Sequence, residues 1–222
     1  MMKNQKNILN KKTMKLMIQN ELDAETKYKD NNPNTMLIPF EKELKKLGYK
    51  FETLSQVIGF LPKHQNYIIP IAMRLYKNTN LEQDKRYFLS LFHFKGMDEC
   101  IPFMLKDMYT DDVSIVIKSL ITENLRAIRS KQYIDDYLRI LAMKELSDAR
   151  NPIIALLGDL KVEQAIPMLI SALDEGKNIT TNALAALGKY RKDELKVYFE
   201  KYVNHQNKYY SREAKRALEK LK

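Results

Sequence analysis

The fold is decided by the stretch Ala165-Ile166-Pro167-Met168-Leu169-Ile170-Ser171-Ala172-Leu173-Asp174, whose Ile-Pro step recurs along the chain. The same step occurs at Ile38-Pro39, Ile69-Pro70 and Ile101-Pro102, so the first three steps follow one another at nearly equal intervals. The gap before Ile166 is about twice as long, and near its middle begins the similar run Ile134-Asp135-Asp136-Tyr137-Leu138-Arg139-Ile140-Leu141. A fixed period of roughly 30 residues is typical of proteins built from stacked repeats.

Each Ile-Pro step is expected to begin a helix, because a proline at the first helical position loses no hydrogen bond. We call these the proline helices. A second set of helices is expected between them, since apolar residues there recur at spacings of three and four rather than two, and no strand is expected. The expected ranges of the second set are roughly 51–61, 81–94, 111–126, 149–158, 179–189 and 209–221.

The second set carries small residues at matched positions. The alignment is clearest between Ile153-Ile154-Ala155-Leu156-Leu157-Gly158 and Ala183-Leu184-Ala185-Ala186-Leu187-Gly188, which stand one period apart. A third segment, Ala214-Lys215-Arg216-Ala217-Leu218-Glu219, follows after one more period. Small side chains let neighbouring helices approach closely, so we expect the helices of this set to stack closely.

One run combines these features: Ala149-Arg150, Ala155-Leu156-Leu157-Gly158-Asp159, Ala165-Ile166-Pro167-Met168-Leu169-Ile170 and Ala172-Leu173-Asp174. It resembles a short HEAT-like repeat, the kind also found in phycobilin lyases and in many small stand-alone bacterial proteins. Residues 149–222 carry the pattern clearly, 38–148 carry it in degraded form, and 1–37 do not carry it. The Val-Arg pair common in the family is Ala149-Arg150 here, then Ile179-Thr180 and Tyr210-Ser211. The arginine is thus present only once. A series of contacts between repeats, from this arginine to the aspartate of the preceding loop, is therefore not expected for the last two repeats.

The resemblance implies an all-α fold, an armadillo-like α-solenoid (an α/α superhelix), with a binding role and no particular ligand. We expect about six helical pairs in residues 38–222, preceded by a capping helix and loop in residues 1–37. That helix is expected at 5–28, with Met14, Met17, Ile18 and Leu22 on one face. A helix lying on a membrane surface is the alternative.

The net charge of +10 comes from the two ends of the chain. Residues 1–20 hold five lysines and no acid, residues 191–222 hold ten basic and five acidic residues, and residues 21–190 hold 23 of each sign. In an elongated array these ends would lie far apart, which argues against one continuous basic stripe for nucleic acid. Nucleic-acid binding by the basic ends stays an alternative.

The sequence favours a cytoplasmic protein without a membrane segment. Cys100 is the single cysteine, which excludes an intramolecular disulfide framework and fits a reducing compartment. No stretch approaches the roughly 18 apolar residues that a membrane span needs. Met14-Lys15-Leu16-Met17-Ile18 is too short and too interrupted for the apolar region of a signal peptide.

No set of residues points to catalysis, a metal or a cofactor. His64, His93 and His205 fall in different repeats at no ligand spacing, so they are expected on the surface or in loops. Cys100 is expected to be a small core thiol rather than a nucleophile. The pairs Asp111-Asp112 and Asp135-Asp136 are expected at helix starts, where carboxylates complement the helix dipole. Some alkylpurine DNA glycosylases also use HEAT-like repeats, so a protein of that class stays an alternative. The resemblance is only architectural, and the chain has no tryptophan to stack on a damaged base.

Two rows on the proline helices form the predicted groove, because the resemblance places these helices on a concave face. The residue after each proline position is large and apolar in five of six repeats: Phe40, Ile71, Phe103, Asp136, Met168 and Tyr198. Three positions further on come Glu43, Arg74, Lys106, Arg139, Ser171 and Lys201, four of them basic. The alternative is that the first row packs between helices and the second is ordinary solvated surface.

The sequence therefore predicts a non-enzymatic protein-binding or scaffold module, most simply a monomer, whose groove takes a protein or acidic peptide. Arg212, Lys215 and Arg216 on the last helix are a second, electrostatic contact or the polar outer face that a terminal repeat needs. The sequence names no partner, and an immunity or regulatory subunit is a further alternative.

Overall fold

The computed structural model describes the backbone of residues 2–221 and the side chains of residues 13–176 and 178–221. Helices and turns make up the described residues, and no strand occurs among them. The expected all-α class is thus confirmed for this part of the chain. The chain divides into two compact units, Met1–Phe92 (unit 1) and His93–Lys222 (unit 2). The boundary expected between residues 37 and 38 lies inside unit 1.

Unit 1 contains α1 (Met2–Asn31), α2 (Leu37–Lys46), the 3₁₀ helix η1 (Leu54–Phe60), α3 (Leu61–Lys77) and α4 (Glu82–Leu91). Helix α3 packs against α2, η1 and α4. It begins well before the Ile-Pro step at Ile69, so Pro70 lies inside the helix and Pro62 occupies its first turn. The proline-start rule is therefore wrong for this helix, although it holds for α5 and α9 in unit 2.

The described part of α1 packs into unit 1 through its C-terminal residues. There the Glu25 carboxylate accepts a hydrogen bond from the backbone N–H of Leu54 at 2.7 Å. Nearer its start, among the described side chains, Met14 and Met17 are 65% and 66% exposed. The expectation that these methionines cover the first repeat is wrong, because no neighbouring element covers them.

A buried carboxylate, Asp84, joins three parts of unit 1. Its side chain is 0% exposed. It accepts hydrogen bonds from the hydroxyls of Tyr28 (2.8 Å), Thr35 (2.5 Å) and Thr79 (2.9 Å) and from the backbone N–H of Met36 (2.7 Å). A buried charge is tolerated when its oxygens are satisfied in this way. Asp84 therefore fixes α4 against α1 and the two loops that flank α2 and α3.

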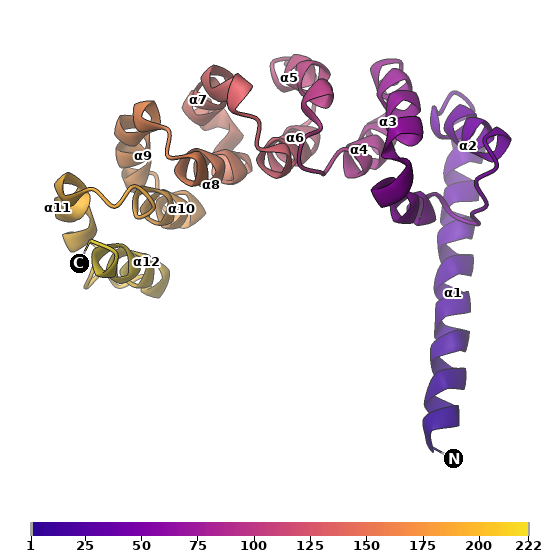
Figure 1. Cartoon of the computed structure of the whole chain (residues 1–222), viewed down its shortest axis with the longest axis horizontal. Coiled ribbons are helices and arrows are strands. Elements are labelled where there is room, and N and C mark those ends of the chain that lie inside the picture. Colours follow the sequence, from indigo (N-terminus) through magenta and orange to yellow (C-terminus); the bar gives the residue numbers. More distant parts are fainter. Residues whose placement is uncertain (1, 222) are drawn as a thin grey trace. The chain divides into compact units, whose positions relative to one another are not determined.

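Unit 2 contains eight α-helices among its described residues, which form two layers (Figure 1). The first layer consists of α6 (Ile115–Ile128), α8 (Asn151–Leu160), α10 (Lys177–Leu187) and α12 (Lys208–Glu219). The second consists of α5 (Ile101–Met108), α7 (Ile134–Ala142), α9 (Ile166–Ser171) and α11 (Lys196–Glu200). All four stand at the proline-helix position of the repeat and keep that name here, although α7 and α11 contain no proline. Short 3₁₀ helices join successive elements: η2 (Asp98–Cys100), η3 (Lys131–Tyr133), η4 (Lys144–Arg150), η5 (Glu163–Ala165), η6 (Ala172–Asp174) and η7 (Asp193–Leu195).

The first layer is continuous, because α6 packs on α8, α8 on α10, and α10 on α12. Each proline helix packs on the following first-layer helix instead, and the proline helices are spread apart along the outer side of the bend of unit 2 (Figure 1). We expected the proline helices on the concave face. For unit 2 this placement is wrong, since the tightly packed layer must take the inner side of a curve.

The small residues of the first layer explain its tight packing. A Cβ added to Gly158 would lie 2.7 Å from Cα of Ala186, and one added to Gly188 would lie 2.9 Å from Cβ of Ala217. The expected close approach of helices at matched Ala and Gly positions is thus confirmed for α8, α10 and α12.

The backbone of unit 2 repeats at or shortly after the ends of three first-layer helices, α6, α8 and α10. Arg129, Lys161 and Arg191 adopt positive φ values of 61°, 52° and 55°, and they stand at nearly equal intervals along the sequence. Gly96, with φ of 84°, stands one such interval before Arg129. Arg129 and Lys161 cap the C-termini of α6 and α8, where a basic side chain complements the partial negative charge of the last carbonyls. Each left-handed residue turns the chain toward the next proline helix.

Candidate binding surface

The predicted apolar row is buried at two positions and partly buried at the others. Phe40 is 0% exposed and meets Phe88 edge to face, with ring centroids 5.4 Å apart. Phe103 is also buried, at 8% exposure. Ile71, Met168 and Tyr198 are partly buried. Phe40 and Phe103 therefore offer no contact area to a partner, and for these two the packing alternative describes the structure.

The predicted cationic row is exposed but largely engaged. In unit 1 the Arg74 guanidinium donates to both oxygens of Glu43, at 2.7 and 2.6 Å. In unit 2 a guanidinium nitrogen of Arg139 lies 3.9 Å from a carboxylate oxygen of Asp136.

Two further members of the rows, Lys201 and Asp136, also interact with aromatic side chains. The Lys201 ammonium lies 5.5 Å from the ring centroid of Tyr198. Asp136 accepts a hydrogen bond from Tyr109, and burial with this bond raises the pKa of Tyr109 to about 12. Lys106 is exposed. Because the unit 2 members stand on the outer layer, they do not line an inner groove.

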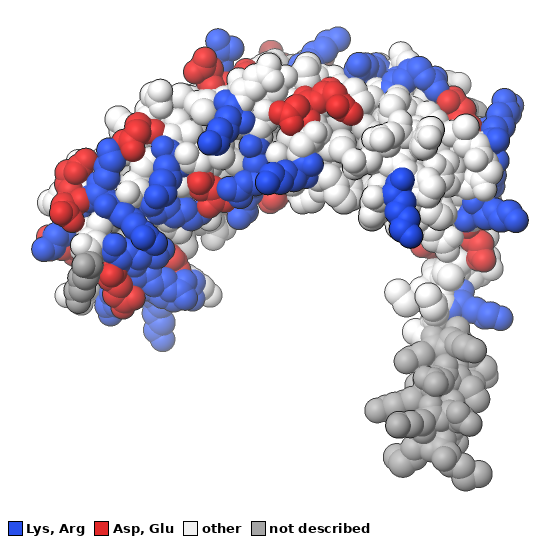
Figure 2. All heavy atoms as spheres, viewed as in Figure 1, with Lys and Arg blue, Asp and Glu red and all other residues white. Residues whose placement is uncertain are grey.

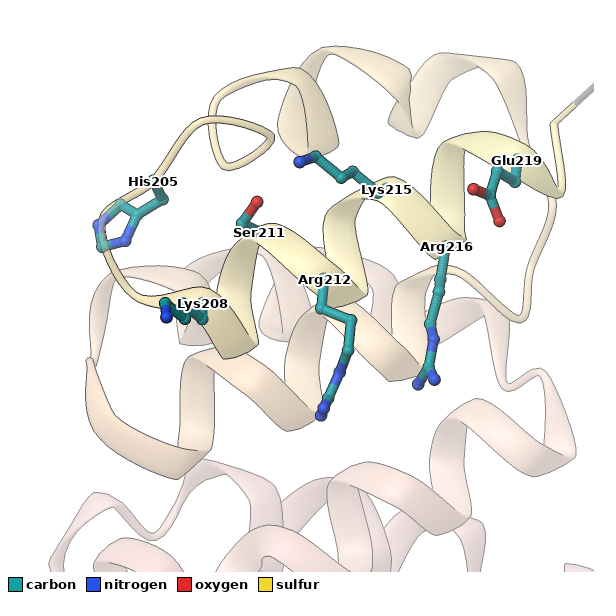
Figure 3. Close-up of a pocket in the computed structure, with 7 residues that line it drawn as sticks. All are labelled: His205, Lys208, Ser211, Arg212, Lys215, Arg216 and Glu219. Carbon is teal, nitrogen blue, oxygen red and sulfur yellow. The ribbon is translucent and has the colours of Figure 1, made fainter.

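A basic hollow occupies the exposed face of α12, the last helix. Its volume is about 470 Å³, and Figure 3 shows the residues that line it: His205, Lys208, Ser211, Arg212, Lys215, Arg216 and Glu219. We call this set the α12 surface. It includes Arg212, Lys215 and Arg216, the three residues predicted as an electrostatic contact, and brings them together on one helix. Sequence reasoning missed Lys208 and His205.

The helix register explains why these side chains gather. Asn207 begins α12 by accepting a hydrogen bond from the backbone N–H of Tyr209 at 2.9 Å. Tyr210, Ala214 and Ala217 then face the core. The spacing of four positions between Lys208, Arg212 and Arg216 places these side chains along one side of the helix. Figure 3 shows Arg212 and Arg216 projecting in parallel from successive turns.

Both arginines of the α12 surface are held in place. Glu213 Oε1 accepts a hydrogen bond from Nε of Arg212 at 3.1 Å and one from Nη1 of Arg216 at 3.0 Å. The Arg212 guanidinium also lies 5.2 Å from the ring centroid of Tyr209, which is 62% exposed. A guanidinium has five N–H donors, so each arginine keeps donors for another group.

A second hollow, of about 340 Å³, lies beside the last turn of α12 and is lined by Gly158, Asp159, Lys161, Lys189, Arg191 and Lys220. Asp159 lies between two cations: it pairs with Arg129 at 3.1 Å and is hydrogen-bonded by Lys189. Burial alone would raise the pKa of Asp159, but these cations hold it below its ordinary value. This hollow is therefore partly neutralised by its own carboxylate.

Figure 2 shows how charge is distributed on one face of unit 2. Lysine and arginine atoms gather over the α12 end, whereas acidic and basic atoms alternate over the other helices. This agrees with the composition of residues 191–222, which contain ten basic and five acidic residues.

The described residues offer few groups for chemistry. Among them, no group of three or more histidine, cysteine, aspartate or glutamate side chains could hold a metal ion. Cys100 is buried, as expected of a core thiol. Within the same part of the chain, no helix is long and apolar enough to cross a bilayer. Comparison with protein-family models gives no match, and comparison with curated proteins gives none either.

Proposed function

We propose that the protein is a HEAT-like α-solenoid that acts as a protein-binding or scaffold module, and that an acidic protein partner docks on the α12 surface. The proposed binding site therefore lies on α12 in the first layer and not on the proline helices, where the sequence predicted it. The proposal has two supports: the repeating contacts of unit 2 and the charge of α12.

Polar contacts across the first layer join equivalent residues of successive repeats. Asn178 donates to Asp148 at 2.9 Å, and Asn182 donates to Asn151 at 2.9 Å. Lys189 and Asp159 form a further pair of this kind. Each contact spans one sequence period, as expected where every repeat touches its neighbours. This regularity favours a solenoid built from the repeats that the sequence predicts.

The observation that carries the binding role is the α12 surface itself. Four cationic side chains, Lys208, Arg212, Lys215 and Arg216, line one hollow together with a single carboxylate, Glu219. The central part of the chain has equal numbers of acids and bases. A local excess of one sign steers a partner of the opposite sign and orients it on contact.

The test is affinity purification from cells that naturally make the protein, followed by mass spectrometry. The test variant reverses the four cations (Lys208→Glu, Arg212→Glu, Lys215→Glu, Arg216→Glu). The matched control applies the same reversal to four exposed cations elsewhere in unit 2, namely Lys95, Arg126, Lys131 and Lys144. We expect a protein with an acidic segment to be captured by the wild type and the control and lost from the test variant. Equal capture by all three would contradict the proposal.

Nucleic-acid binding is the second candidate, because Tyr209 is exposed beside a row of cations. Exposed aromatic rings and cations together bind single strands by stacking and by phosphate contacts. Such binding weakens steeply with salt, since counterions are released from the phosphates. A labelled single-stranded RNA titrated at several salt concentrations separates this candidate from the first. Tight binding with a steep salt slope, lost in the test variant, would favour it.

A further inference from the structure

The exposed face of α12 does not suit another closely packed helix. In the first layer Gly158 of α8 receives Ala186 of α10, and Gly188 of α10 receives Ala217 of α12. The next residue in this series, one period after Gly188, is Glu219, which is exposed. Its long charged side chain stands at the position that is glycine in the two preceding repeats. A partner must therefore meet the ends of the α12 side chains rather than the helix surface.

Arg212 and Arg216 are already in position to bind. Glu213 is only 13% exposed and holds both guanidiniums, while the ring of Tyr209 supports Arg212. A side chain that is fixed before binding loses less conformational entropy when it binds. Guanidinium groups bind carboxylates through paired, parallel hydrogen bonds. The pair therefore forms two adjacent carboxylate sites.

The spacing of these sites suits an extended chain. About one helical turn separates Arg212 from Arg216, a rise of about 6 Å. In an extended chain, residues i and i+2 point to the same side and lie about 6.6 Å apart. Alternate acidic residues of an extended segment would thus meet successive arginines. Lys208, one turn before Arg212, would meet a third acidic residue of the segment.

The acids on α12 favour a peptide over a nucleic acid. Glu213 lies between the two arginines and Glu219 lines the end of the hollow. A nucleic acid carries a charge at every phosphate and would meet repulsion at both glutamates. A peptide can place carboxylates only where the cations stand.

From these observations we infer that the α12 surface binds an extended acidic segment of the partner, with one carboxylate on Arg212 and the next acidic side chain on Arg216. Glu213 and Tyr209 act as positioning residues. The inference rests on the proposed function and adds the form of the ligand.

The test measures the affinity of the full chain for three fluorescein-labelled probes by anisotropy. The first peptide alternates glutamate with threonine, which favours an extended chain. The second carries the same number of glutamates spaced four apart in alanine, which favours a helix. The third probe is a single-stranded oligonucleotide. We expect the extended peptide to bind most tightly, and Arg212→Gln with Arg216→Gln to weaken it by about tenfold or more. Control substitutions of the exposed Lys131 and Lys144 by Gln should leave its affinity unchanged.

Glu213→Gln tests the positioning role. We expect it to weaken binding of the extended peptide several-fold while the thermal unfolding midpoint stays the same, because a merely structural residue would change the midpoint. Tighter binding of the helical peptide or the oligonucleotide would overturn the inference, as would no effect of the arginine substitutions. If no peptide binds while the four-residue reversal still abolishes capture of a native protein, the inference fails and the proposed function stands.

Discussion

At the scale of single residues, unit 2 uses different side chains for the same task. Arg150, Thr180 and Ser211 occupy equivalent positions in successive repeats. Each donates to a backbone carbonyl of the segment before its helix: Arg150 to Leu141, Thr180 to Leu173 and Ser211 to Val203. Arg150 also pairs with Glu175 in the loop before the next helix. The side-chain hydrogen bond to the preceding segment is therefore kept where the arginine is replaced by threonine or serine. The sequence pattern alone did not show this.

Thr180→Val tests the importance of this tie. Thr180 is 0% exposed, and its hydroxyl donates to Leu173 and accepts from the N–H of Gly176, each at 2.9 Å. Valine keeps the shape but leaves both backbone groups without this partner. We expect the free energy of unfolding to fall by about 1–3 kcal/mol in urea denaturation. Thr181→Val, at the next and more exposed position, should change it by less than about 0.5 kcal/mol. Equal effects would show that the hydroxyl of Thr180 is not the cause.

At the scale of helices, the first layer depends on two glycines for its spacing. In an ordinary exposed helix, Gly→Ala stabilises by about 1 kcal/mol. At Gly158 the new methyl group would lie 2.7 Å from both Cα and Cβ of Ala186, closer than atoms can approach. The backbone atom cannot rotate away, so the two helices would have to separate.

We therefore predict that Gly158→Ala destabilises the protein, by about 1–3 kcal/mol in urea denaturation. The control is Gly59→Ala, since a Cβ at Gly59 meets nothing within 4 Å. That substitution should be neutral or slightly stabilising. A stabilising effect of Gly158→Ala would mean that α8 and α10 are not in close contact.

The helices themselves could be predicted from the sequence because their signals are local. Proline at a helix start and matched Ala-Leu-Gly segments gave α5, α8, α9 and α10, and the three basic residues of the α12 surface followed from composition. Which layer lies inside could not be predicted, because curvature depends on how closely each layer packs. The sequence left the burial of Phe40 and Phe103 open for a related reason. A residue one position off the core stripe can face solvent or a neighbouring helix, and the pattern within one helix does not distinguish the two.

At the scale of the whole molecule, the two ends of the chain have similar charge but different packing. Deleting residues 1–16 removes five lysines, and deleting residues 207–222 removes six basic and two acidic residues. At the first end, Met14 and Leu16 are 65% and 62% exposed and cover nothing. At the second end, Tyr210, Ala214 and Ala217 are buried, and Ala217 packs on Gly188. The second deletion would expose this apolar face of α10 to solvent.

Two truncations of equal length should thus behave differently in thermal unfolding followed by circular dichroism. Deletion of residues 1–16 should shift the midpoint by no more than about 2 °C, because no described core contact is lost. Deletion of residues 207–222 should lower it by more than about 5 °C and cause self-association on size-exclusion chromatography, since the apolar face of α10 that α12 covers would be exposed. Similar behaviour of the two truncations would mean that the contact of α12 with α10 adds little to stability.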